Sequence, residues 1–171
     1  MRLYSGQVAV VAQDILKTLL NDEDLEVLDE NISEVEEDIQ SVLKEFIRLD
    51  REITEKARDA AAERGNSSIG REKRRLSKQM GVSIAEDPIG FIVDQLIETF
   101  FHSHFVEEVF AADNDLRRQM SPVLRRHMSV QEELDSEVRD KIKNLEEGSA
   151  AWEIEYQRAL GNLKRTKKLE E

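Results

Sequence analysis

The sequence has no cysteine, two prolines and seven glycines among its 171 residues, and aromatic residues make up only 5% of it. Without cysteine the chain can form no disulfide framework, and it offers neither a thiol nucleophile nor a thiolate metal ligand. So few prolines and glycines leave long stretches without a helix breaker, which favours helices. The apolar run at 8–12 is too short for the core of a signal peptide, and no later segment approaches a transmembrane span. We therefore expect a soluble cytoplasmic protein with no membrane attachment.

Charged residues are abundant, at 36% of the chain against roughly 25% in an average globular protein. They give a formal net charge of −12, which on average repels nucleic acids and anionic membranes, although a local basic patch can override the mean. The apolar fraction of 39% comes in periodic clusters and is large enough for a packed core, which argues against disorder. The length fits one domain or two small ones.

The start of the chain predicts a helix followed by a short extended segment. Ser5 is positioned to cap a helix that runs to about Leu20, because the apolar residues between them fall three and four apart on one face. The polar residues at 21–24 interrupt this helix. The sequence Leu-Glu-Val-Leu at 25–28 then suits an extended conformation.

A long second helix is predicted by apolar residues at the 3.5-residue period of helices that pack nearly parallel or antiparallel. Asn31 or Ser33 is positioned to cap it, because each has a glutamate three residues later, as in a capping box. The apolar seam comprises Val35, Ile39, Val42, Phe46, Leu49 and Ile53, followed by Ala57 or Ala60. The sequence GNSS at 65–68 ends the helix, and a short basic helix follows.

The second half of the chain follows the same plan. Asp87 and Pro88 supply an N-cap and a first-turn proline for a helix, and a second long seam comes after it. The seam comprises Leu116, Met120, Val123, His127, Val130, Leu134, Val138, Ile142 and Leu145. Pro122 should kink or restart this helix because it removes a backbone donor, and Ser129 with a glutamate three positions later offers another cap. We expect shorter segments here, and a last amphipathic helix after the Gly-Ser turn at 148–149.

The two halves align when 81 is added to each position of the first. The match runs without a gap across residues 8–58, pairs apolar with apolar positions, and pairs Arg58 with Arg139, each followed by aspartate. After the loop that follows the second helix, an offset of 83 continues the alignment and pairs Gly65 with Gly148. For the residues just before Arg139, an offset of 85 gives a better match and pairs Leu49 with Leu134. These offsets differ by about one helical turn, so the apolar seam faces the same way in either. We interpret the pattern as a tandem duplication with repeats at 1–81 and 82–171.

Short motifs near both ends of the chain carry a family resemblance. Met-Arg-Leu stands at 1–3, Leu-Asp-Ser-Glu-Val-Arg-Asp-Lys-Ile at 134–142 and Gly-Ser at 148–149, followed by Trp152 and Tyr156 in a helix with basic residues. In these features the chain resembles a bacterial family known only as domain of unknown function 507. Its usual member is about half this length, so the chain resembles a fused pair, although the first repeat lacks the aromatic pair. The resemblance implies a helical bacterial cytoplasmic protein and brings no activity or ligand with it.

Few residues suggest chemistry at a site. His102, His104 and Glu108 form a cluster with metal-ligand residue types, and His104 and Glu108 stand four apart as on one helix face. A bound metal normally needs three or four converging ligands, so we expect a polar connection here and no metal site. His127 lies on the second seam and is expected to be partly buried and bonded to a neighbour. No nucleophile, acid–base pair or phosphate loop stands out, so we expect no catalytic residue, no cofactor and no enzyme activity.

Basic residues are concentrated near the end of each repeat. The first group comprises Arg71, Lys73, Arg74, Arg75 and Lys78, and the second comprises Arg158, Lys164, Arg165, Lys167 and Lys168. Both groups suit contact with nucleic-acid phosphates, or with acidic faces of this chain or of a partner. No aromatic residues are interleaved with them for stacking on bases, which weakens the nucleic-acid interpretation.

Together these patterns predict an all-α fold in which two tandem copies of a helical unit pack as a pseudo-symmetric bundle. As function we expect a non-enzymatic interaction or scaffold protein that contacts another bacterial protein. The alternative is an RNA- or DNA-associated factor that uses the basic helices at 71–78 and 158–168. The chain would be a monomer with pseudo-dimeric repeats or a homo-oligomer.

Overall fold

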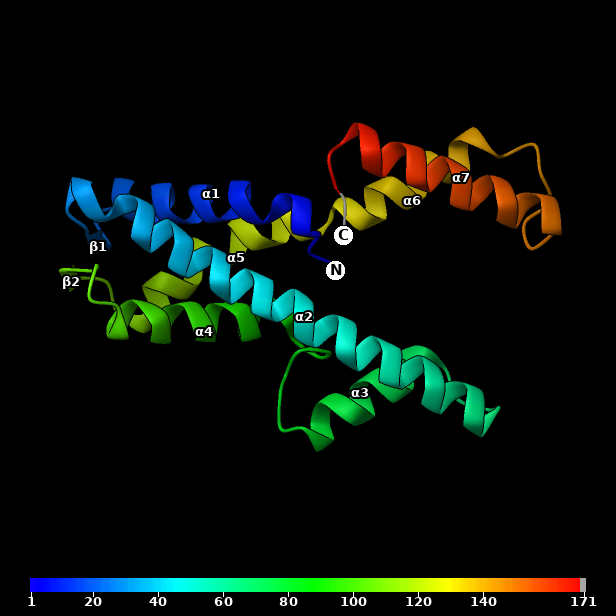
Figure 1. Ribbon diagram of the computed structural model, residues 1–171, viewed down its shortest axis with the longest axis horizontal. Coiled ribbons are helices and arrows are strands. Elements are labelled where there is room, and N and C mark those ends of the chain that lie inside the picture. The colour runs from blue at the N-terminus through cyan, green and yellow to red at the C-terminus, as the bar shows by residue number, and fades with distance from the viewer. Residues whose placement is uncertain (170–171) are drawn as a thin grey trace.

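The computed structural model describes residues 1–169, which form an all-α protein with two very short strands (Figure 1). The helices are α1 (Val8–Asn21), α2 (Ile32–Arg64), α3 (Ile69–Gln79), α4 (Pro88–His102), α5 (Asp113–Met128), α6 (Val130–Lys141) and α7 (Ala150–Thr166). The strands are β1 (Leu25–Glu26) and β2 (Glu108–Val109), and short 3-10 turns at Ser5–Gln7 and Asp29–Asn31 precede α1 and α2. The helical class predicted from the sequence is confirmed.

Four helices form the body of the molecule. α1 packs against both α2 and α5, and α4 packs against the same two helices, so α1 and α4 lie diagonally opposite each other (Figure 1). The facing side chains form the main core, which draws on both halves of the sequence. Its fully buried members include Ile15, Leu43, Ile92, Leu96, Leu116 and Leu124. Burial of each such side chain contributes about 1.5–3 kcal/mol, so this core holds the four helices together.

The two strands close one end of the body. They pair antiparallel, with Leu25 opposite Val109 and Glu26 opposite Glu108. The backbone N–H groups of Phe110 and Ala111 extend the contact by donating to the Asp24 carbonyl at 2.9 and 3.2 Å. This end, which we call the strand end, therefore joins a segment of each half through backbone hydrogen bonds.

Two helical arms leave the other end of the body and diverge (Figure 1). The first arm is the C-terminal part of α2 together with α3, which packs along it, and the second arm is α6 with α7. The core of the first arm continues the main core through Ile53 and Ile84. The second arm has a separate small core, made of Tyr4, Leu134, Val138, Ile142, Leu163 and Leu169. The two arms are thus attached to the body in different ways.

The N-terminal segment ties the second arm to the body. Tyr4 is buried in the core of that arm, and its N–H donates to the Gln7 side chain at 3.0 Å. The amide of Gln7 in turn donates to the carbonyl of His127 at 2.8 Å. Gly6 lies so close to the carbonyl oxygen of Lys168 that a Cβ atom would clash with it. The start of the chain is thus packed against the turn that follows α7.

Several helix boundaries follow the signals in the sequence. α4 begins at Pro88, and the Asp87 carboxylate accepts a hydrogen bond from the N–H of Gly90 at 2.9 Å. α2 ends at Arg64 and is followed by Gly65, whose φ of 68° is the left-handed conformation that glycine adopts at little cost. The seam residues predicted for α2 are buried or half-buried.

Several predicted capping details are wrong. Ser5 lies inside the 3-10 turn, and Gln7 is the N-cap of α1. Asn31 is the N-cap of α2, but within the described chain its side chain accepts no capping hydrogen bond. α5 continues through Pro122 without a restart, and the expected division into shorter helices falls at Ser129. Pro122 is exposed, so the carbonyl that loses its partner lies on the solvent-facing side of the helix, where water can satisfy it. Ser129 does not cap α6 through its side chain, because its hydroxyl donates to the Arg126 carbonyl at 3.0 Å.

Candidate functional site

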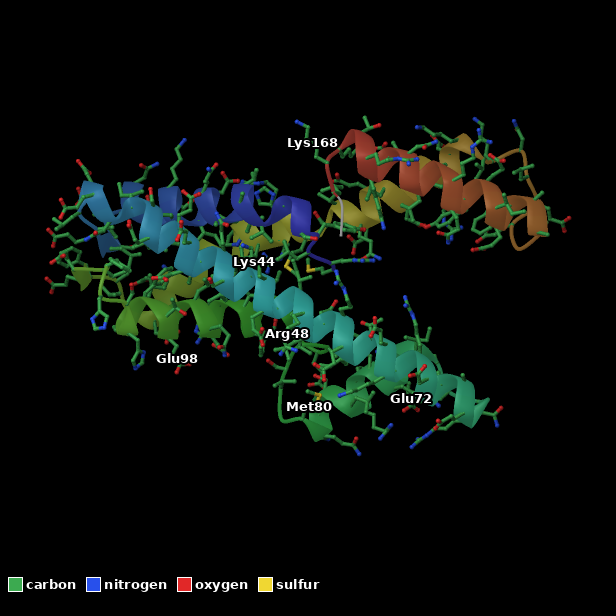
Figure 2. The ribbon with its side chains drawn as sticks, viewed as in Figure 1. Lys44, Arg48, Glu72, Met80, Glu98 and Lys168 are labelled. Carbon is green, nitrogen blue, oxygen red and sulfur yellow. The ribbon has the colours of Figure 1, made fainter. Side chains whose placement is uncertain are left out.

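Part of the basic group on α3 stabilises the first arm from within. Glu72 is 1% exposed, and its carboxylate accepts hydrogen bonds from Ser67 and Arg75, both at 2.7 Å (Figure 2). These hydrogen bonds hold the pKa of Glu72 below its ordinary value. Lys73 forms an ion pair with Asp50 of α2 at 2.6 Å. Arg75 and Lys73 therefore hold α3 in place and are already engaged within the chain.

The other basic residues of α3 face solvent. Arg71, Arg74 and Lys78 are exposed, and no carboxylate of residues 1–169 forms an ion pair with any of them. The basic group predicted from the sequence therefore divides into an engaged part and an exposed part.

The basic residues of α7 are arranged differently. Lys167 pairs with Glu137 of α6 at 2.7 Å, and the Nζ of Lys164 lies 5.1 Å from the centre of the Tyr4 ring. Burial, together with the charge of Arg2, lowers the pKa of Lys164. Among the others, Arg158, Arg165 and Lys168 are exposed. α7 packs on α6 and α3 packs on α2, so the two basic helices belong to different arms and do not form one continuous surface (Figure 1).

The histidines do not form a metal site in the described residues. α4 ends at His102, whose Nδ1 lies 2.8 Å from the carbonyl of Glu98, and Glu108 lies in β2. His104 and Glu108 therefore do not share a helix face as the spacing suggested. Residues 1–169 contain no group of three or more histidine or carboxylate side chains placed to hold a metal ion.

His127 is half-buried at the junction of body and second arm, as its place on the seam predicted. Its Nε2 lies 2.7 Å from a carboxylate oxygen of Asp14, which also accepts from Arg126 at 3.1 Å. This contact joins α5 to α1, so the histidine has a structural role in linking two helices of the body.

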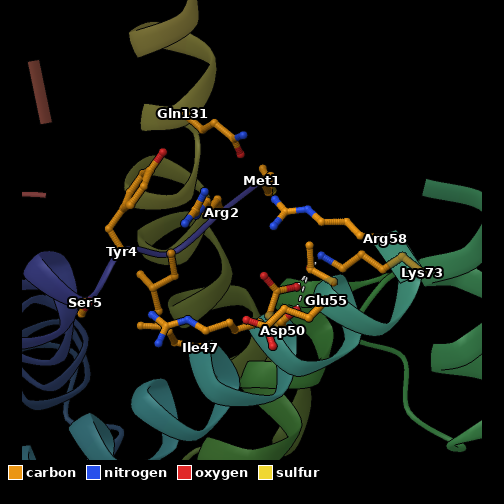
Figure 3. A pocket seen from close by; sticks show the side chains of 13 residues that line it. Met1, Arg2, Tyr4, Ser5, Ile47, Asp50, Glu55, Arg58, Lys73 and Gln131 are labelled. Carbon is orange, nitrogen blue, oxygen red and sulfur yellow. Dashed lines mark hydrogen bonds and ion pairs between the residues drawn. The ribbon is translucent and has the colours of Figure 1, made fainter. Parts of the chain in front are cut away.

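A polar pocket that the sequence did not predict lies in the angle between the two arms (Figure 3). Its volume is about 350 Å³, and its walls are the N-terminal segment 1–5, one face of α2, Lys73 of α3 and Gln131 of α6. Four cationic side chains line it: Arg2, Arg51, Arg58 and Lys73. Two carboxylates, Asp50 and Glu55, line it as well. We call this the inter-arm pocket.

The cations of the inter-arm pocket come from separate elements. Arg58 and Lys73 extend from the first arm toward the N-terminal segment, and Arg2 lies on the opposite wall, with its guanidinium 4.8 Å from the centre of the Tyr4 ring (Figure 3). Arg51 and Arg58 are seven residues apart on α2, which is about two turns, so they lie on one face of the helix. This spacing was the signal available in the sequence, but only the folded chain places the N-terminal segment opposite it.

Arg58 and Arg139, which the alignment pairs, have different surroundings. Arg139 bonds the carboxylates of Asp135 and Glu147 at 3.0 and 2.6 Å, and it lies 5.4 Å from the centre of the Trp152 ring. Arg58 is exposed at the inter-arm pocket and forms no ion pair with any carboxylate of residues 1–169. The same residue type is therefore fully engaged in one arm and left available in the other.

Large apolar side chains are exposed at the strand end. Phe101 and Phe110 are 61% and 58% exposed, and Phe105 and Leu28 are also exposed. Of these side chains, Phe110 also lines a hollow of about 570 Å³, together with Leu20, Glu23, Leu25, Glu26 and Val27. No helix of the described residues is long and apolar enough to cross a bilayer.

Two comparisons with known proteins bear on identity. A search of curated proteins finds no match for the chain. In contrast, residues 1–169 match a family described as "Protein of unknown function (DUF507)". The match covers nearly the whole chain, including both arms and the strand end. The chain therefore belongs to the DUF507 family, whose function is unknown.

Proposed function

We propose that this protein is a non-enzymatic helical interaction protein of the bacterial cytoplasm, and that it contacts another protein through its strand end. The observation that carries the proposal is the exposure of Phe101 and Phe110, of which Phe110 also lines an open hollow. Single exposed apolar residues are normal, but several large exposed ones near one end of a protein are typical of an interaction surface. Aromatic side chains are enriched where partners bind most strongly, because they bury a large apolar area.

The charge around the hollow indicates the chemistry of the partner. Glu23 and Glu26 line the same hollow as Phe110, and Glu108 lies in the paired strand. A partner surface with an apolar centre and basic residues at its rim would complement this arrangement. The acidic rim also suits a protein partner better than a nucleic acid, whose phosphates it repels.

Partner capture with matched variants tests this proposal. The wild-type protein and the Phe101→Glu/Phe110→Glu double variant are used as baits in an extract of the native cell, and a captured protein is then purified and its Kd measured. Ile154→Glu is the control, because Ile154 is 67% exposed but lies on the second arm. We expect the double variant to weaken binding at least tenfold and the control to match wild type. Equal affinity of the two variants would rule out the strand end as the interface.

We also infer that the chain arose by tandem duplication of a helical unit, with copies at 1–81 and 82–171. The starts of the helices support this, since α1, α2 and α3 begin at 8, 32 and 69, and α4, α5 and α7 begin at 88, 113 and 150. The packing supports it as well, because α1 against α5 and α4 against α2 are equivalent contacts. In this proposal, single-length relatives form homodimers and fusion fixes the pair. Light scattering on residues 82–171 alone tests it: a folded monomer that does not associate would contradict the proposal.

A second candidate function is association with RNA or DNA, which the three exposed cations of α3 favour. Arg71, Arg74 and Lys78 form no ion pair within residues 1–169 and so remain available for phosphates. The test is whether nucleic acid co-purifies at low salt and is lost when these three residues become glutamate. Arg75 is left unchanged, because it pairs with the buried Glu72 and its loss would disturb the arm itself. Absence of co-purifying nucleic acid from the wild-type protein would reject this candidate.

A further inference from the structure

We propose that the inter-arm pocket binds a small molecule that carries a diphosphate group, with Arg51 and Arg58 as its main contacts. The pocket measures about 350 Å³, which is within the range of roughly 300–1,000 Å³ typical of small-molecule sites. Its cationic lining is unusual for this chain, whose formal net charge is −12. A concave basic pocket in an acidic protein concentrates anions locally, because the field of its cations is focused between the walls.

The ion pairs within the pocket determine which charged side chains remain available to bind a ligand. Lys73 is engaged with Asp50 at 2.6 Å, and that pair is neutral overall. Arg51 and Arg58 are exposed on α2 and form no ion pair with a carboxylate of residues 1–169, while Glu55 stands on the same helix between them. Arg2 stands on the opposite wall of the pocket. The two positive charges of Arg51 and Arg58 exceed the single negative charge of Glu55, and an anion with more than one charge can pair with both arginines.

The comparison of Arg58 with Arg139 strengthens the assignment. Arg139 stabilises the second arm through two carboxylates and an aromatic ring, as a structural arginine does. No equivalent carboxylate or ring engages Arg58 among the described residues, so holding the first arm together does not explain it. An arginine without an internal partner at the wall of a pocket is placed to bind an external anion.

The geometry of the arginines favours phosphate groups. A guanidinium offers paired N–H donors that match the oxygens of a phosphate, so each arginine binds one phosphate in a bidentate manner. Arg51 and Arg58 are separated by about 10 Å along α2, and their long side chains can converge on two adjacent phosphates of one molecule. Gln131, on the second arm, offers an amide to the remainder of the ligand (Figure 3). A ligand seated in this way contacts both arms at once.

A nucleic-acid strand fits the pocket less well than a small molecule. The N-terminal segment forms one wall and α2 the other, so the site is bounded on two sides by backbone. A strand needs an open groove that follows its backbone over several nucleotides, with aromatic side chains on which its bases stack. The one aromatic residue of the lining, Tyr4, is 2% exposed and lies beneath Arg2 and Lys164.

Calorimetric titration of the full chain with inorganic pyrophosphate at low ionic strength tests the proposal. The Arg51→Gln/Arg58→Gln variant should bind at least tenfold more weakly than wild type. Arg118→Gln is the matched control, because Arg118 is an exposed arginine of α5 outside the pocket, and its affinity should be unchanged. Far-UV circular dichroism establishes that each variant is folded, and Arg58→Lys should retain part of the affinity because it keeps the charge.

Three results would overturn the proposal. The first is no binding of pyrophosphate by the wild-type protein at millimolar concentration. The second is equal loss of affinity in Arg118→Gln and in the double variant, which would indicate a general charge effect. The third is a short oligothymidylate that binds more tightly than pyrophosphate through the same two arginines, which would assign the site to nucleic acid.

Discussion

Replacing Leu134 with alanine should unfold the second arm and leave the body folded. Leu134 is fully buried in the small core of that arm, where only six described side chains are buried. A buried Leu→Ala change costs about 2–5 kcal/mol. A core of this size rarely supplies more than roughly 3–5 kcal/mol, so the substitution removes most of the arm's own stability. A loss of about 3 kcal/mol raises the unfolded fraction of the arm more than 100-fold.

Trp152 gives this prediction a specific probe, because it is the single tryptophan of the chain and lies on α7. Its ring stacks on Tyr156 with the ring centres 5.0 Å apart, and the guanidinium of Arg139 lies 5.4 Å from its centre. Near-UV circular dichroism and tryptophan fluorescence therefore report on the second arm, whereas far-UV circular dichroism reports on all helices. In buffer without denaturant, we expect Leu134→Ala to show the fluorescence and near-UV signals of a solvent-exposed Trp152. Most of the far-UV helical signal should be retained, because the helices of the body stay folded. Hydrogen exchange should be fast in α6 and α7 and unchanged in α1, α2 and α4.

The matched control is Leu116→Ala, which removes an equally buried leucine from the main core. It should lower the urea midpoint of the far-UV signal, because the body then loses a similar free energy. The main core and the core of the second arm share no buried side chain. Independent unfolding of the arm would be refuted by a Leu134→Ala variant whose tryptophan and far-UV signals fall together at one lowered midpoint, since the arm and the body would then unfold as one unit.

Three further predictions concern the same arm and its anchor. Hydrogen bonds from Tyr156 and Arg139 lower the pKa of Asp135 from its ordinary 3.8, so this stabilisation is present above pH 3.8 and is lost as the pH falls through the folded-state value. In Asp135→Asn, the stability of the second arm should therefore depend less on pH than in wild type when acid unfolding is followed by Trp152 fluorescence. An acid-unfolding profile identical to that of wild type would contradict this. Burial and the bond to Asp135 raise the pKa of Tyr156 to about 12, and burial also raises that of Tyr4, so phenolate absorbance should show little ionisation at pH 10 while the protein is folded. Gly6→Ala should release the turn after α7, because its Cβ meets the Lys168 carbonyl, whereas Gly161→Ala, in open space on α7, should stabilise by about 1 kcal/mol. Thermal unfolding of both variants measures this, and a neutral Gly6→Ala would show that the anchor is not tight.

The sequence predicted the helices better than their breaks. Apolar periodicity located α1, α2, α4 and α7 because burial of one face decides the position of a helix, and glycine or an Asp-Pro pair marked several of the ends. The restart expected at Pro122 does not occur; the carbonyl that loses its partner lies on the exposed side of α5, where water can satisfy it, and exposure is a property of the folded chain. The pairing of β2 with β1 was also not predictable, since two-residue strands carry no periodic signal.

The candidate site was harder to predict for a different reason. The basic residues of α3 stand out as a group in the sequence, but composition does not indicate that Arg75 pairs with the buried Glu72 while Arg74 is exposed. The inter-arm pocket joins the first five residues to one face of α2 and to single residues of α3 and α6. Such a set is brought together by tertiary packing alone, so no local pattern identifies it.

The unequal attachment of the two arms has a mechanical consequence. α2 is one continuous helix of 33 residues, about 50 Å long, and it belongs to both the body and the first arm. The second arm instead begins at the break at Ser129 and is held to the body by contacts of the N-terminal segment. The position of this arm therefore depends on the contacts of Tyr4, Gln7 and Gly6, which lie outside the main core. Loss of those few contacts would leave the second arm joined to the body mainly through the chain at Ser129, while the first arm would still share the continuous helix α2.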